Sequence, residues 1–103
     1  ITVDFGRNSK IQTIDNWAFR KCVKLTAIDI PKSVTKIGIS AFDKCKAIKS
    51  ITIPAGVESV GARAFGSWTK DQIIYVEGYS KAPDGWSSDW NVECNATVIW
   101  SMV

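Results

Sequence analysis

The chain has 103 residues, 46 % of them apolar, and its net charge of +3 comes from 13 basic and 10 acidic residues, which indicates one soluble globular domain, or a piece of one, without nucleic-acid binding. Histidine is absent, which excludes Ser-His-Asp and Cys-His nucleophile systems, an imidazole general base and His-ligated catalytic zinc. No stretch approaches the roughly 18 apolar residues of a membrane-spanning helix, so we expect no membrane insertion by this fragment.

The chain opens without Met and already in the alternating pattern of a strand, over residues 1–5. We therefore expect the end of a longer protein, whose upstream repeats would stack on this unit. Residues 6–10 should form a longer turn than their counterparts in later units. The apolar side chains expected to form an open face, through which the isolated fragment would pair, are Val3, Phe5, Ile11, Ile14 and Phe19.

The chain repeats itself with a period of 23 residues. Ile14, Ile37 and Val60 mark this period, and a Phe follows each of them five residues later. Each unit has a short apolar strand, a turn, a second short strand and Ala-Phe at the head of a brief helix. One unit buries too few side chains to offset the entropy of ordering its backbone, so units must stack. The sequence predicts an α/β repeat solenoid of about three repeats over residues 1–76, followed by a capping segment, residues 77–103.

Aligning the units gives ladders of like residues. The predicted inward ladders are Val3, Ile28, Ile51 and Ile74; Phe5, Ile30, Ile53 and Val76; Ile11, Val34 and Val57; and Phe19, Phe42 and Phe65. Because side chains alternate along a strand, the residues between the ladders face solvent. They form the candidate partner-binding surface, with Asp4, Asp29, Thr52 and Tyr75 on the first strands and Lys36 and Glu58 on the second. Lys36 and Glu58 are expected to attract each other across the sheet.

Three cysteines occur in the chain without a CxxC pair. Cys22, Cys45 and Trp68 occupy the same place in successive units. If short helices carry them, neighbouring units lie about 10 Å apart there, too far for a disulfide. We expect free thiols used as small apolar fillers, no metal site and no cofactor.

Basic residues follow the predicted helical turns of two units. They are Arg20, Lys21 and Lys24, then Lys44, Lys46 and Lys49. A solvated convex face explains this ridge, and contact with an acidic partner or a polyanionic glycosaminoglycan is the functional alternative.

Beyond the third Phe the pattern ends. Residues 73–76 give a last strand of the repeat type, residues 83–91 replace the second strand, and residues 97–100 give a closing strand. Trp86, Trp90 and Trp100 are expected to cap the terminal ladder. The alternative is an aromatic platform for a sugar ring. Its candidate residues are Trp86, Trp90, Tyr75 and Tyr79.

Residues 25–45 follow the pattern L-x-x-I-x-I-P-x-x-V-x-x-I-G-x-x-A-F-x-x-C, which recurs from Ile48 to Phe65 and, less completely, from Val3 to Cys22. Here the chain resembles the BspA-like, or treponemal-type, leucine-rich repeat family. The resemblance implies a leucine-rich-repeat right-handed superhelix with short parallel strands and short helical turns. It also implies a cell-surface or secreted protein that serves adhesion or protein recognition, with a host extracellular or surface protein as a possible partner, and no catalytic residues.

Two readings of the function follow besides recognition. The fragment could be a structural spacer that ends a longer array, or an accessory domain beside a catalytic one. An enzyme within these residues is not expected, because Asp29, Asp43, Glu58 and Asp71 are scattered along the chain.

Overall fold

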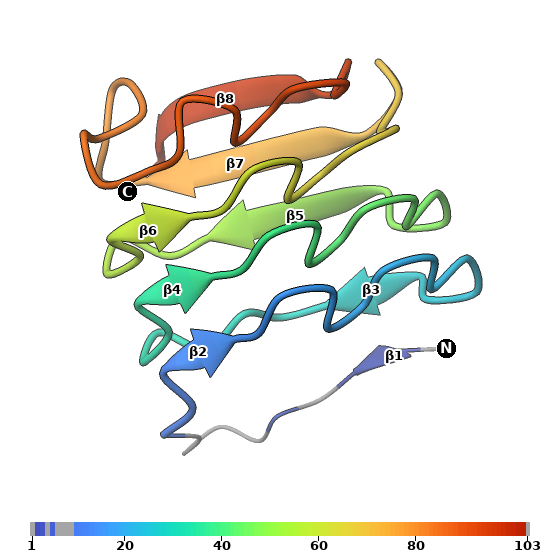
Figure 1. Ribbon diagram of the computed structural model, residues 1–103, viewed down its shortest axis with the longest axis horizontal. Helices are drawn as coiled ribbons and strands as arrows, with labels where there is room; N and C mark the ends of the chain where they lie inside the picture. The colour runs from blue at the N-terminus through green and yellow to red at the C-terminus, as the bar shows by residue number, and fades with distance from the viewer. Residues whose placement is uncertain (1, 4, 6–9, 103) are drawn as a thin grey trace.

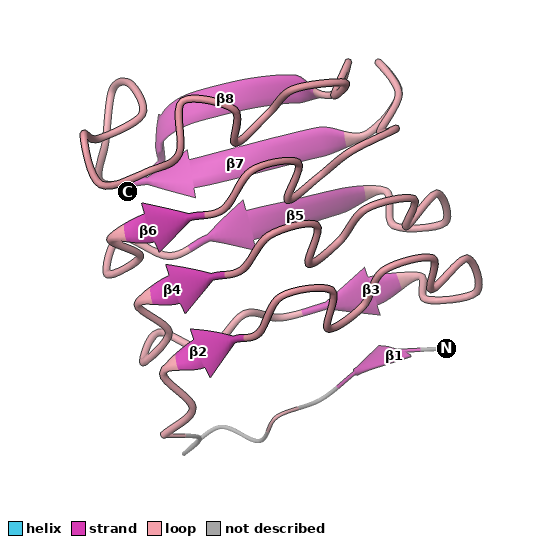
Figure 2. Ribbon diagram, viewed as in Figure 1, coloured by secondary structure: helices cyan, strands magenta, loops and turns pink. Residues whose placement is uncertain are grey.

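The computed structural model describes residues 2, 3, 5 and 10–102, and in this part of the chain it has strands and turns but no helix (Figure 2). The strands are β1 (Thr2–Val3), β2 (Thr13–Ile14), β3 (Ala27–Ile28), β4 (Lys36–Ile37), β5 (Ser50–Ile53), β6 (Ser59–Val60), β7 (Ile73–Glu77) and β8 (Thr97–Met102). Within the described residues, no helix has the length and apolar character that crossing a membrane requires.

The strands form two rows on opposite sides of the stacked units (Figure 1). One row holds β2, β4 and β6 as a three-stranded sheet, and the other holds β1 with β3, then β5, β7 and β8. All pairings are parallel, and Thr13, Lys36 and Ser59 lie opposite one another, which repeats the 23-residue period. The prediction of a repeat fold with parallel strands is therefore confirmed.

The predicted ladders form the core between the rows. β5 shows the alternation clearly, because Ile51 and Ile53 are buried while Ser50 and Thr52 are exposed. The buried ladder residues are Ile28, Ile51 and Ile74; Ile30, Ile53 and Val76; Val34 and Val57; and Phe42 and Phe65. Phe19, Phe42 and Phe65 stack face to face, with ring centroids 5.5 Å apart in each pair. This aromatic column follows the repeat through three successive units.

Ile11 departs from the predicted ladders, because 37 % of it is exposed. Its equivalents Val34 and Val57 are fully buried. Val34 has a described unit on either side of it, whereas Ile11 lies in the first described unit and has a described unit on one side. Phe5 and Phe19 are half-buried and pack against the core.

The segments after each second strand form turns where the sequence predicts short helices. Phe19 N donates to Ala41 O of the next unit (2.8 Å), and Phe42 N donates to Ala64 O (2.7 Å). Intervening amides, such as Cys45 N, donate three residues back, so no run of helical bonds forms. A helix is about 10 Å wide, whereas strands lie about 4.8 Å apart, and the turns keep the units at the strand spacing. The handedness of the winding stays a prediction.

The last segment packs on the last repeat. β8 pairs with β7, with an irregularity between Tyr75 and Glu77, and Trp86 and Trp90 are each only 5 % exposed. The segment therefore adds both a strand and apolar area to the last repeat, although β7 extends one residue past the predicted boundary at residue 76.

Candidate binding surface

The outward residues of the β3, β5, β7 and β8 row line up on one face. Asp29 and Thr52 are exposed, and Tyr75 is half-exposed. Thr52 lies opposite Tyr75 in the register, and Tyr75 lies opposite Ile99 of β8. Asp4, the fourth predicted residue of this row, lies outside the described residues. The row therefore presents a carboxylate, a hydroxyl, a phenol and an aliphatic side chain in succession.

Ile99 was not among the predicted surface residues. It is 36 % exposed and continues the row past Tyr75. The alternation within the predicted closing strand carries the signal for it, but the pairing of β8 with β7 is needed to place it in this row.

Lys36 and Glu58 lie on the other row and do not face each other. Lys36 pairs with Ser59, and Glu58 N donates to Thr35 O at 2.8 Å. The expected attraction between Lys36 and Glu58 is therefore wrong. The two residues are 22 positions apart, one short of the period, so the register offsets them. The five of these predicted residues that the structure describes thus divide between two surfaces instead of forming one site.

A shallow hollow of about 200 Å³ lies beside β2 and β4. Its lining includes Thr13, Asp15, Asn16, Trp17 and Lys36. Trp17 is 58 % exposed, and Asn16 Oδ1 accepts the amide of Ile39 at 2.8 Å. Trp17 was not among the residues predicted from the sequence. The signal was the position's place in the repeat, since the equivalent residues of later units are polar, Ser40 and Arg63.

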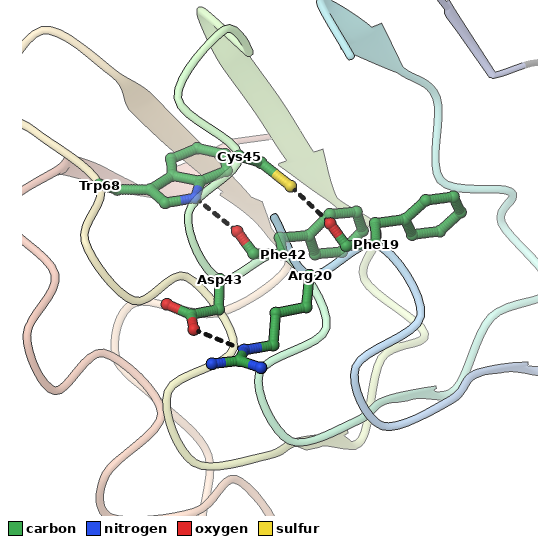
Figure 3. Close-up of polar contacts among 6 residues, drawn as sticks. All are labelled: Phe19, Arg20, Phe42, Asp43, Cys45 and Trp68. Carbon is green, nitrogen blue, oxygen red and sulfur yellow. Dashed lines mark hydrogen bonds and ion pairs between the residues drawn. The ribbon is translucent and has the colours of Figure 1, made fainter. Parts of the chain in front are cut away.

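The turns of neighbouring units are also joined by side chains (Figure 3). Cys45 Sγ donates to Phe19 O, and Trp68 Nε1 donates to Phe42 O, each at 2.9 Å. Arg20 Nε lies 3.3 Å from Asp43 Oδ2, where the Asp43 side chain is 14 % exposed. A thiol in one unit and an indole in the next thus make equivalent bonds to the preceding Phe carbonyl.

The three cysteines are free thiols, as expected. Burial raises the pKa of Cys45 from 9.0 to about 11, and burial also raises the pKa of Cys94, because an apolar environment disfavours the thiolate. These thiols are therefore poor nucleophiles at neutral pH. The spacing argument against a disulfide does not hold, however, since the turns stack at the strand distance. Among the described residues, no group of three or more acidic, Cys or His side chains could hold a metal ion.

The C-terminal aromatic residues form one packed cluster. Trp86 and Trp90 have ring centroids 5.0 Å apart, and Trp100 and Tyr79 lie within 6.2 Å of Trp86. Trp86 Nε1 donates to Val57 O at 3.3 Å. Because Trp86 and Trp90 are buried, their rings pack against the core and offer no open platform, so the structure does not support the predicted sugar site.

Comparison with known proteins gives one match. The model of the BspA type leucine-rich repeat region, with six copies, matches residues 2–82. No curated protein and no solved structure matches the chain.

Proposed function

Because the chain belongs to the BspA-type leucine-rich repeat family, we propose that it is a non-catalytic protein-recognition or adhesion module of a cell-surface or secreted protein. The observation that carries the proposal is the row formed by Asp29, Thr52, Tyr75 and Ile99, whose side chains alternate with a fully packed core. The core fixes the backbone, so these outward side chains can differ without loss of the fold.

The chemistry of this row suits a protein partner. A half-exposed Tyr with an aliphatic neighbour gives an anchor of the kind that dominates protein interfaces, and the carboxylate of Asp29 supplies a polar rim. We expect the partner to be a host extracellular or surface protein, bound without a cofactor. The right-handed winding implied by the family is part of the same proposal, since parallel crossovers are almost always right-handed.

A binding screen against extracellular matrix and cell-surface proteins tests the proposal. For a partner so found, Asp29→Arg combined with Thr52→Arg should weaken binding about tenfold or more, because both positions are exposed in this row. The matched control is Thr13→Arg combined with Thr35→Arg, which makes exposed changes on the other row. Loss of binding in the control alone would move the interface to the β2, β4 and β6 row, and the absence of any partner would count against recognition.

The C-terminal cluster favours a second function, that of a spacer which ends a longer array. Trp86, Trp90 and Trp100 cover the last repeat with apolar area, as a terminal unit requires. In this case, replacing the outward residues of both rows in the longer protein would leave adhesion unchanged. Deleting the capping segment, residues 77–103, would change it.

A further inference from the structure

Six lysines gather on one edge of the stack, where β3, β5 and β7 begin. The segments 20–26, 43–49 and 66–72 lie side by side there (Figure 1), joined by bonds from Lys21 N to Asp43 O (2.7 Å) and from Lys44 N to Gly66 O (2.9 Å). The lysines, called the basic edge below, are Lys21, Lys24, Lys44, Lys46, Lys49 and Lys70. All are exposed except Lys44, which is half-buried.

The positive charge of this edge has little compensation. Its three segments contain only two acidic residues, Asp43 and Asp71, and Asp43 pairs with Arg20. In the part of the chain that the structure describes, the recorded ion pairs are Arg20–Asp43 and Arg63–Glu93, and neither involves a lysine of the basic edge. The six ammonium groups are therefore available to an external anion.

Two of these lysines stand where a lysine is unfavourable. Lys21 has φ 62° and Lys44 has φ 64°, in the left-handed region that glycine adopts without cost. The same turn follows each of them, because Val23 N donates to Lys21 O and Lys46 N donates to Lys44 O. The turns thus place the two lysines in register in neighbouring units, whose backbones lie about 4.8 Å apart, and like charges in register repel each other. An anion lying across both would relieve that repulsion.

We propose that the basic edge binds a linear sulfated polysaccharide. Such a chain carries many anionic groups along its length, and lysine ammonium groups at regular intervals match it as point charges. A single-stranded nucleic acid fits less well, because bases stack on exposed aromatic rings. The aromatic residue of the three segments is Trp68, which is 1 % exposed and donates its N–H to Phe42 O. This binding is independent of the protein partner of the strand rows.

The test is binding of the 103-residue chain to heparin, measured by affinity chromatography and by titration over a range of salt concentrations. The informative variant is Lys21→Gly combined with Lys44→Gly, because it removes two charges and also relieves the left-handed backbone. The thermal stability of this variant should equal or exceed that of the unmodified 103-residue chain. The matched control, Lys32→Gln with Lys36→Gln, removes the same charge from exposed positions near and on β4.

The glycine variant should elute from heparin at lower salt, with the slope of log affinity against log salt reduced by about one for each lysine removed. The control should elute close to the parent. If both variants shift equally, or if neither shifts, the edge is not a binding site. Should the glycine variant fail to fold, Lys24→Gln with Lys46→Gln replaces it under the same criteria. Equal competition by desulfated heparin or by single-stranded oligothymidine would also overturn the proposal.

Discussion

At the scale of single residues, the position three residues after each Phe shows how the units are joined. Cys45 and Trp68 differ in size and chemistry, yet each donates to a Phe carbonyl of the preceding unit. Cys45 makes this bond as a protonated thiol, because burial raises its pKa to about 11. The protonation state of one side chain is therefore coupled to the stability of the stack.

This coupling predicts a loss of stability in alkaline solution. Below pH 9 the thiol is protonated in the folded and unfolded chains alike, so Cys45 adds no pH dependence. Between pH 9 and about 11 the unfolded chain releases this proton and the folded chain retains it, so the free energy of unfolding should fall, by at most about 2 to 3 kcal/mol.

Urea unfolding of the parent and of Cys45→Ala at about pH 8 and about pH 10.5 measures this effect. The alanine variant is less stable overall, but it should lose less stability over this interval, because the other titrating groups are common to both chains. Parallel pH profiles for the two chains would show that Cys45 is not coupled to folding.

At the scale of elements, the close approach of neighbouring turns depends on glycine. A Cβ on Gly61 would lie 2.5 Å from Ile39 N and 2.7 Å from the carbonyl carbon of Gly38, both backbone atoms. Gly61 N also donates to Ile37 O at 2.8 Å, so the turn cannot move away without losing that bond.

Gly61→Ala should therefore destabilise the chain by about 3 kcal/mol, in the upper range for overpacking. Gly56→Ala is the matched control, because its nearest neighbour, Lys32 O, lies at an ordinary 3.5 Å. That variant should change stability by less than about 1 kcal/mol. Thermal unfolding of both chains, followed by circular dichroism, checks the prediction. Equal losses of stability in the two variants would show that the close approach of the turns does not require glycine at position 61.

The strands were predictable, whereas the turns between them were not. Period-two alternation places Ile51 and Ile53 inside and Thr52 outside regardless of what surrounds them. The conformation after Ala41-Phe42 depends on where the amides find partners, and those partners are carbonyls of the next unit. The local sequence does not show which carbonyls these amides bind. The predicted helices, and the 10 Å spacing inferred from them, were therefore wrong.

The same division applies to the candidate surface. Asp29, Thr52 and Tyr75 follow from alternation. The register pairs Thr52 with Tyr75, and Asp29 is exposed at the equivalent place of the preceding repeat. Ile99 requires the pairing of β8, and the exposed Trp17 requires a left-handed φ of 59°. The place of Ile99 depends on a tertiary contact, whereas the left-handed φ recurs at Ser40 (54°) and Arg63 (58°) and therefore follows the 23-residue repeat.

At the scale of the whole molecule, the Trp cluster packs against the last repeat. Trp86→Ala should destabilise the chain by about 3 to 5 kcal/mol, since Trp86 is buried and contacts three other aromatic rings. Trp17→Ala, at a position 58 % exposed, should cost less than about 0.5 kcal/mol. Urea unfolding followed by circular dichroism compares the two. A small loss for Trp86→Ala would show that the last repeat is stable without its cover.

The turns described above also govern how an array of such units would grow. Hydrogen bonds join neighbouring units at the strands and again at the turns, with similar donor–acceptor distances at both. If both flanks keep the strand spacing, successive units add without a wedge between them. Each added unit then lengthens a nearly straight wall by about 4.8 Å. In such proteins the number of units would set reach and leave curvature unchanged.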